Sequence, residues 1–270
     1  MGRRDATRHP TIRVDLLGSL EVCTAAGTPI ALGGRHAPAL FALLVLARRP
    51  RSREAIAADL WPESDATSAA MLRQALWLVR HGLARVGIDP ISILDIRPES
   101  IGIRPDARLE IDVEAFERCL DDIGCGAERA VALYRGDLVE SLGHDCFAAE
   151  RERLADRYED ALVTVAQQRL AEGDLTRARR AAEQAIARDP LREEAHAILI
   201  AVLGRTGSRS QVVRQYRRLE VLLAHELGEP PLPETDAAYR QAMRDVVRRS
   251  LEQVALAGID RRPTLVAVGP

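Results

Sequence analysis

The stretch AMLRQALWLVRHGLARVG, Ala70 to Gly87, decides how the N-terminal half of this chain is interpreted. Wound as an α-helix, it aligns four apolar side chains at the spacing of a core-facing stripe: Leu72, Leu76, Val79 and Leu83. The opposite face carries Arg73, Gln74, Trp77, Arg80 and His81. The helix therefore has one side suited to a core and one side rich in groups that can bind a partner.

The elements around this helix are short. After about ten residues without a pattern, Ile12, Val14 and Leu16 alternate with polar residues, which predicts a strand. Turns follow at 18–19 and 26–27, and Pro29 with Ile30 opens a third strand. Helices are then expected at 37–47, at 53–61 behind a Ser52 cap, and over the quoted stretch behind a Ser64 or Asp65 cap. Strands at 91–96 and 101–104 are joined by the turn Arg97 to Ser100.

A small sheet, three helices and a hairpin is the order of a winged helix, a relative of the helix-turn-helix. In such folds the third helix enters the major groove of double-stranded DNA, and the hairpin flanks it. A small α+β domain without a role in DNA binding has the same order of elements. The pattern alone leaves these two interpretations about equal.

From Asp112 onward the pattern is helical throughout. Amphipathic helices are expected at 112–122, 126–135, 146–171, 175–188, 192–206, 209–226 and 235–250. Two helical hairpins repeat at an offset of 34 residues, which places Leu170 and Gly173 against Gly204 and Gly207. This offset is the tetratricopeptide period, and such hairpins stack into a superhelix with a groove for peptides or partner domains. The fold expected is mainly α: an N-terminal winged helix-turn-helix of the α+β class, then an all-α tetratricopeptide-like domain.

Composition agrees with packed helices. The 270 residues suit two domains or one large one, and only 3% of them are aromatic. The formal net charge of −2 hides an asymmetry, because residues 1–110 hold 15 arginines against 12 acidic residues. This mild basic bias supports phosphate binding only weakly.

Several function classes lack a signal. Cys23, Cys119, Cys125 and Cys146 show no metal-ligand spacing and are expected to be free thiols in a reducing cytoplasm. No apolar run is long enough for a membrane span, and no leader for export is visible. GGRH at 33–36 lacks the strand and helix of a nucleotide site. We therefore expect a cytoplasmic protein that is not an enzyme, with no cofactor, no metal and no membrane contact.

Several stretches together resemble the SARP-type transcriptional activators, which join a winged helix to a bacterial transcriptional activator domain. These stretches are LLGSLEV (16–22), SREAIAADLWPES (52–64), MLRQALWLVRHGL (71–83), DVEAFE (112–117), LYRGDLVE (133–140), FAAERERL (147–154) and YRRLEVLLAHELGEPPLPET (216–235). The resemblance implies an activator that binds direct repeats near a promoter, as a head-to-tail homodimer on DNA, and that contacts RNA polymerase. It also implies dimer contacts and, in some members, a signal input at the helical domain.

By this resemblance, the quoted helix is the recognition helix, and Arg73, Gln74 and Arg80 match its LRQAL…R pattern. These side chains could bind guanine or adenine edges, or phosphate. Ser52 and Arg53 begin the preceding helix, whose positive end favours a phosphate. Further backbone contacts are predicted for Arg35 and His36 before the first helix, and for Arg97 at the wing tip, with Arg104 further along.

The chain departs from the family pattern at Trp77, Leu78 and His81, where polar or basic residues are usual. Trp77 could lie against a sugar or a thymine methyl, and could stack with Arg73 and Arg80 in a cation–π cluster. It could also be buried against the helical domain, which would close the reading face. Both alternatives stay open.

Other conspicuous residues are interpreted structurally. Trp61 is expected in the core, and Asp145, between His144 and Cys146, is expected to cap a helix rather than take part in catalysis. The run ERERLADRYED (150–160) is expected to be a solvated face with i,i+4 ion pairs. The pairs Arg179–Arg180 and Arg217–Arg218 are expected to face solvent, or to line a groove for an acidic or phosphorylated signal.

The sequence thus predicts a winged-helix DNA-binding domain at 11–108, a tetratricopeptide-like activator domain at 110–250 and a disordered tail at 251–270. Its predicted function is sequence-specific regulation of transcription, as an activator. The alternative is an adaptor for a partner protein, or a sensor of a small-molecule signal, whose winged helix no longer reads DNA.

Overall fold

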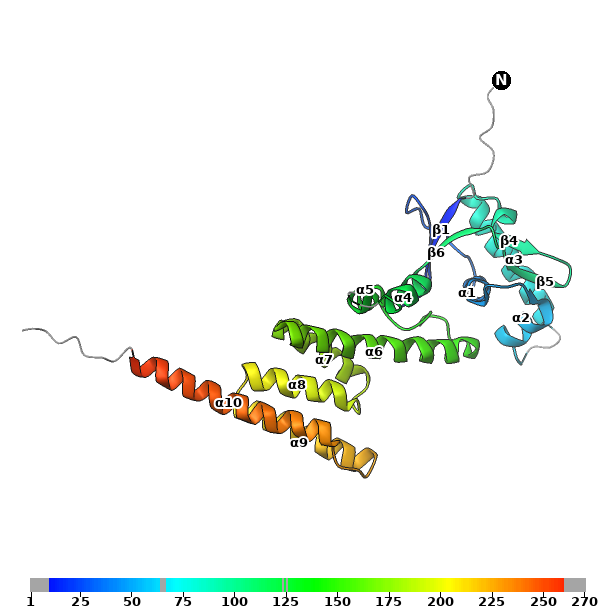
Figure 1. Cartoon of the computed structure of the whole chain (residues 1–270). Coiled ribbons are helices and arrows are strands. Elements are labelled where there is room, and N and C mark those ends of the chain that lie inside the picture. The colour runs from blue at the N-terminus through cyan, green and yellow to red at the C-terminus, as the bar shows by residue number, and fades with distance from the viewer. Residues whose placement is uncertain (1–9, 64–66, 123, 125, 260–270) are drawn as a thin grey trace, which may run out of the picture. The chain divides into compact units, whose positions relative to one another are not determined.

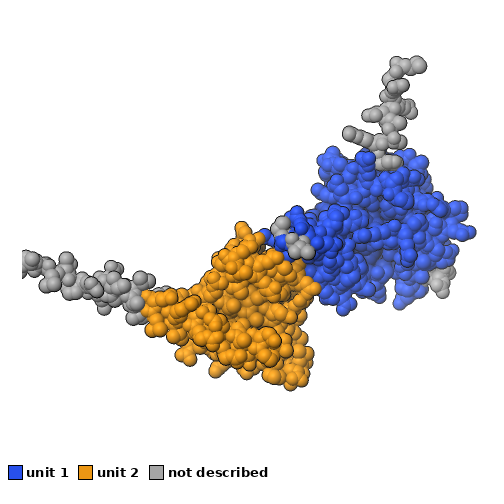
Figure 2. Space-filling model, in the orientation of Figure 1, with its two compact units in different colours: residues 1–158 blue, residues 159–270 orange. Residues whose placement is uncertain are grey.

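The computed structural model describes residues 10–63, 67–122, 124 and 126–259, with the backbone alone over 253–259. The chain divides into two compact units (Figure 2), residues 1–158 (unit 1) and residues 159–270 (unit 2). The fold is mainly helical with a small N-terminal sheet region, as predicted (Figure 1). Within the described part of the chain, no helix is both long enough and apolar enough to cross a membrane.

Unit 1 has the predicted order of elements, with two strands added. Its strands are β1 (Thr11–Asp15), β2 (Glu21–Thr24), β3 (Arg51–Ser52), β4 (Leu94–Ile96), β5 (Ser100–Ile103) and β6 (Arg108–Ile111). Its helices are α1 (Ala37–Ala47), α2 (Arg53–Leu60), α3 (Ser68–Arg85), α4 (Asp112–Leu120) and α5 (Gly126–Leu133), with short 3-10 turns η1 (Pro90–Ser92) and η2 (Asp145–Phe147). The helix α6 (Ala148–Glu172) begins in unit 1 and continues into unit 2.

Besides its helices, unit 1 contains two three-stranded sheets (Figure 1). In the first, of order β2-β1-β6, β1 pairs antiparallel with β2 and parallel with β6. The second, of order β3-β5-β4, is the wing, in which the predicted hairpin gains β3 as a third strand. The third strand predicted at Pro29 is wrong, since Pro29 makes only an isolated bridge to Cys23.

The helices of unit 1 enclose a single core. The helix α1 is apolar around nearly its whole circumference, and its Leu40, Phe41 and Leu44 are fully buried. The helix α3 packs on α1 and α2 through the predicted stripe of Leu72, Leu76, Val79 and Leu83. Ser52 caps α2 as predicted, because its hydroxyl accepts a hydrogen bond from the amide of Ala55 at 3.1 Å. The predicted caps Ser64 and Asp65 lie outside the described residues.

The first unit extends well beyond the domain boundary predicted at 108–110. Asp112, the first residue of α4, is buried, and its carboxylate accepts hydrogen bonds from the amides of Leu16 and Leu17 at 2.8 to 2.9 Å. Burial raises the pKa of Asp112, while these backbone hydrogen bonds oppose the rise. Further along, the Val139 amide donates to the Leu16 carbonyl at 2.8 Å. The helices α4 and α5 are therefore built onto β1 and belong to unit 1.

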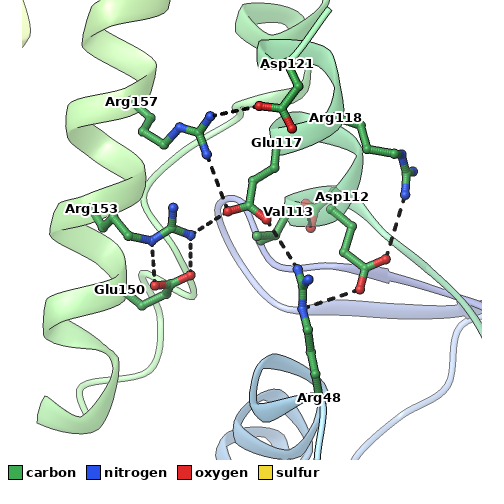
Figure 3. Close-up of polar contacts among 10 residues, drawn as sticks. Arg48, Asp112, Val113, Glu117, Arg118, Asp121, Glu150, Arg153 and Arg157 are labelled. Atoms are coloured by element: carbon green, nitrogen blue, oxygen red, sulfur yellow. Dashed lines mark hydrogen bonds and ion pairs between the residues drawn. The ribbon is translucent and has the colours of Figure 1, made fainter. Parts of the chain in front are cut away.

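The acidic and basic run at 150–160 is solvated only in part: Glu152, Arg153, Asp156 and Asp160 are exposed, as expected, but its arginines also pair with another helix. Glu117 of α4 accepts ion pairs from Arg48, Arg153 and Arg157, and Arg157 also reaches Asp121 (Figure 3). Within the run, Arg153 pairs with Glu150 at i,i+3. The arginines of this run thus bind carboxylates of α4. Each of these partners is 36 or more residues away in the sequence.

Two other structural interpretations have different outcomes. Trp61 is buried in the core, as expected. Asp145 does not cap a helix: η2 begins at this residue and is preceded by His144, so the capping position falls one residue earlier. Among the described cysteines, Cys23, Cys119 and Cys146 are free thiols, and Cys125 lies outside the described residues.

Unit 2 contains the repeated hairpins. After α6 come α7 (Leu175–Arg188), α8 (Glu193–Thr206), α9 (Arg209–Glu226) and α10 (Pro233–Ile259), and consecutive helices from α7 to α10 pack together. The repeat is visible in the caps, because Asp174 caps α7 and Ser208, 34 residues later, caps α9. Gly204 lets α8 approach α10 closely, since a Cβ there would lie 2.6 Å from the Cα of Ala242. The tail predicted to be disordered from residue 251 is wrong in its first part, because α10 continues to Ile259.

Candidate nucleic-acid interface

The helix α3 separates its side chains into a buried and an exposed face. Leu72, Leu76, Val79 and Leu83 anchor it in the core of unit 1. All five residues predicted to bind DNA on this helix are exposed: Arg73, Gln74, Trp77, Arg80 and His81. Their three- and four-residue spacing makes one continuous strip along the helix.

Trp77 is paired with a histidine on this strip. Its indole is 58% exposed and stacks on the imidazole of His81, with ring centroids 5.0 Å apart and planes 8° from parallel. The predicted cation–π cluster of Trp77 with Arg73 and Arg80 is not among the aromatic contacts of the described residues. His81 lies four residues after Trp77 and Arg73 four residues before it, so both are neighbours of Trp77 on the helix surface. The ring of His81 therefore competes with the guanidinium group of Arg73 for the same indole.

A glycine-containing loop fixes the middle of α3. The carbonyl of Ala31 lies so near that a Cβ on Gly82 would meet its oxygen at 2.6 Å. Gly34, at a positive φ of 73°, lies against Leu78 in the same way. Leu78 is therefore half-buried beneath this loop, which explains why an apolar residue stands there. The same loop leads directly into Arg35, which is exposed.

His36, the next residue, makes a hydrogen bond within the protein. Its Nδ1 accepts a hydrogen bond from the indole Nε1 of Trp61 at 3.1 Å. An indole nitrogen can only donate, so the imidazole must keep this nitrogen unprotonated. Burial, with a contribution from the Arg35 charge, lowers the pKa of His36. His36 therefore joins α1 to the end of α2 through this nitrogen, and its contact with DNA stays a prediction.

Arg53 ties the start of α2 to the tip of the wing. Its Nε donates to the carbonyl of Pro98 at 2.7 Å, and its Nη2 donates to the carbonyl of Arg97 at 3.0 Å. Its backbone amide also donates to the carbonyl of Glu99 at 3.0 Å. Since the hydroxyl of Ser52 is engaged as the cap of α2, both residues act here on the protein's own backbone. We interpret them as positioning residues for the wing.

Arg97 and Arg104, on either side of β5, are each paired with an acid two residues away. Arg97 binds Asp95 at 2.8 Å, and Arg104 binds Asp106 at 2.8 Å. The hydrogen bond and charge of Asp95 raise the pKa of Arg97, and Asp106 does the same for Arg104. The wing therefore carries little net positive charge, and the positive charge of this surface is concentrated at Arg73, Arg80 and Arg35.

The structure places the strip on α3 and the wing in the same unit. It also shows two features of the wing that the sequence pattern does not predict. The two-residue strand β3 and the hydrogen bonds of Arg53 have no periodic signal, because they depend on contacts more than 40 residues away in the sequence. Within the described residues, no cluster of histidine, cysteine and acidic side chains could hold a metal ion.

A winged helix with an exposed, arginine-bearing third helix, followed by tetratricopeptide-like repeats, is the architecture of a transcriptional regulator. Comparison with known proteins agrees. Residues 112–243 match the family described as the bacterial transcriptional activator domain. The transcriptional regulatory protein MoaR1 of Mycobacterium tuberculosis is 26% identical over 264 residues, covering 91% of this chain and 83% of its own length. MoaR1 of Mycobacterium bovis is 26% identical over 260 residues, with the same coverage.

A solved structure shares the fold. Mycobacterium tuberculosis EmbR, in complex with a low-affinity phosphopeptide, superposes with a TM-score of 0.73 at 22% identity. The match covers 95% of this chain and 73% of that one. Residues 112–243 thus match a bacterial transcriptional activator domain, and the comparisons together support a transcriptional regulator of the SARP type.

Proposed function

We propose that this protein is a sequence-specific DNA-binding activator that reads the major groove with the exposed strip of α3. The observation that carries the proposal is the division of this helix, whose leucines are buried while Arg73, Gln74 and Arg80 are exposed side by side. Guanidinium and amide groups can make paired hydrogen bonds to guanine and adenine edges. An α-helix fits the width of the major groove.

The wing supports the same mode of binding through its shape. Arg53 fixes the turn of the wing to the first residue of α2, so the wing is held in place before any contact with DNA. With its arginines paired to Asp95 and Asp106, the wing adds little charge. We therefore expect α3 and Arg35 to provide most of the affinity, and the overall affinity to be modest.

The family supports a finer proposal. In this proposal the protein acts in the cytoplasm, two copies bind direct repeats near a promoter, and the bound pair contacts RNA polymerase. The residues of α3 would then be used twice, once on each repeat. Substitutions on this helix should therefore weaken binding to both half-sites.

Titration of labelled DNA from upstream of the protein's own gene, at two salt concentrations, tests the role of α3. We expect Arg73→Ala or Arg80→Ala to weaken binding by about 1–3 kcal/mol if the side chain contacts a base. A phosphate contact would instead weaken binding to all sequences alike and lower the salt dependence by about one unit.

Arg108→Ala is the matched control, because Arg108 is an exposed arginine on β6, outside both α3 and the wing. It removes the same charge and should bind DNA like the parent protein. If the α3 variants also bind like the parent, α3 is not the recognition helix.

A further inference from the structure

A groove runs along the repeated helices of unit 2. It encloses about 710 Å³ and is lined by α7, α8 and α9. The lining residues are Arg179, Glu183, Leu199, Leu203, Gln211, Arg214, Gln215, Arg217, Arg218 and Val221. All of them lie in unit 2, so the groove is separate from the proposed DNA-reading strip of unit 1.

The floor of the groove is apolar. Leu199 and Leu203, one turn apart on α8, line the floor of the groove, and each is 6% exposed. At its edge on α9 stands Val221, which is 68% exposed. A ligand that fills the groove can therefore bury an aliphatic side chain against these three residues.

The wall formed by α9 carries positive charge without partners. Arg214, Arg217 and Arg218 are exposed, and they take part in none of the hydrogen bonds or ion pairs found within the described ranges. On α7, Arg179 is instead neutralised by Glu183, with its Nε 2.8 Å from the carboxylate. The groove thus has three uncompensated guanidinium groups above an apolar floor.

The two glutamines of the lining are already held in place. Gln211 closes the capping box of α9, where its Oε1 accepts a hydrogen bond from the Ser208 amide at 2.9 Å. The Nε2 of Gln215 lies 2.9 Å from Nδ1 of the buried His196. These contacts hold the two glutamine side chains in place, so among the polar side chains of the lining a ligand would need to order mainly the arginines.

We infer that this groove binds an acidic peptide segment in which carboxylates flank an aliphatic residue. Carboxylates match the guanidinium groups, which bind them through paired hydrogen bonds. The aliphatic residue matches Leu199, Leu203 and Val221. A nucleic-acid backbone would satisfy the arginines but would leave the apolar floor without a partner, so the peptide is the better fit.

Fluorescence anisotropy with the full chain tests this inference. The probe is a short fluorescein-labelled peptide of glutamates and leucines, and its control has glutamine in place of every glutamate. We expect saturable binding of the glutamate peptide and at least about tenfold weaker binding of the glutamine peptide. Arg214→Gln combined with Arg218→Gln should weaken binding of the glutamate peptide at least about tenfold, and Arg217→Gln should weaken it separately.

Arg180→Gln is the matched control, since Arg180 is an exposed arginine on α7 outside the lining. This variant should bind the peptide within about twofold of the parent protein. The Arg73→Ala variant should also keep peptide binding, which separates failure of this inference from failure of the DNA-reading proposal. Equal binding of the two peptides, or unchanged binding by the Arg214 and Arg218 variant, would overturn the inference. An oligonucleotide could also displace the peptide, and its own binding could be lost in the Arg214 and Arg218 variant. That result would overturn the inference and assign the groove to nucleic acid.

Discussion

The two tryptophans of unit 1 show how exposure decides the role of one residue type. Trp61 is 7% exposed at the end of α2, where it packs in the core and donates to His36. Trp77 is 58% exposed on α3 and contacts the ring of His81. We expect Trp61→Ala to lower the free energy of unfolding by about 3–5 kcal/mol. Trp77→Ala should change it by less than about 0.5 kcal/mol and should instead weaken DNA binding.

Urea unfolding of both variants, followed by DNA titration of Trp77→Ala, measures these effects. Trp77→Phe serves as a control, since it keeps a flat ring that can stack on His81 or a sugar. A large loss of stability in Trp77→Ala would show that the indole is a packing residue and would remove it from the proposed interface.

For single residues, the sequence predicts which side chains are buried better than it predicts which side chains they contact. The leucine stripe of α3 follows from helical periodicity, and the structure confirms it. The partner of Trp77 does not follow, because Arg73 and His81 lie equally close on the helix surface. The bonds of Arg53 to the wing are equally hidden, since only the folded chain brings the turn at 97–98 to the start of α2.

Among the elements, helices are predicted closely and short strands are not. The bounds expected for α1, α7 and α9 are the observed ones, because proline, aspartate and serine mark their first turns. The strands β3 and β6 are missed, since two to four residues show no pattern until a partner strand is known. Without β3, the wing could be predicted only as a two-stranded hairpin.

The wing offers a test of how its charge is controlled. Asp95 holds the guanidinium group of Arg97 at 2.8 Å, so Asp95→Asn should release that positive charge at the wing tip. If the wing flanks DNA as proposed, the variant should bind all duplexes more tightly at low salt. Its affinity should depend on salt more steeply by about one unit.

Asp106→Asn provides the comparison, because it frees Arg104 at the other end of β5. The double variant Asp95→Asn with Arg97→Gln should return to the salt dependence of the parent protein. If Asp95→Asn leaves both affinity and salt dependence unchanged, the wing tip does not approach the phosphates.

In the whole molecule, the family boundary and the compact boundary differ. The bacterial transcriptional activator domain begins at residue 112, whereas unit 1 continues to residue 158. Asp112 explains the difference, because its carboxylate binds the amides that follow β1 and so fastens the first helix of that domain to the winged helix. The strand pattern gives way to a helical pattern near residue 112, so the sequence predicts a boundary at 108–110, but the packing of α4 does not follow this change of pattern.

Both units contain histidines that are at least partly buried, which makes the stability of the whole chain sensitive to acid. Burial lowers the pKa of His36 and His144 in unit 1 and of His196 in unit 2. The unfolded chain takes up protons near the ordinary pKa of 6.5, whereas the folded chain resists them until a lower pH. Stability should therefore be complete above about pH 6.5 and should be lost as the pH falls below it.

His196 allows the effect to be assigned to one unit. It is 1% exposed, and its neutral ring bridges the carbonyl of Pro190 at 3.1 Å and the amide of Gln215 at 2.9 Å. Hydrogen exchange of α8 and α9 amides should show faster opening as the pH is lowered from about 7.5 to about 5.5, after correction for the intrinsic rate. His196→Gln cannot take up a proton, so its opening free energy should depend less on pH over the same range. Equal pH dependence in the variant and the parent protein would mean that folding does not change the pKa of His196, and the acid sensitivity assigned to the contact between α8 and α9 would be wrong.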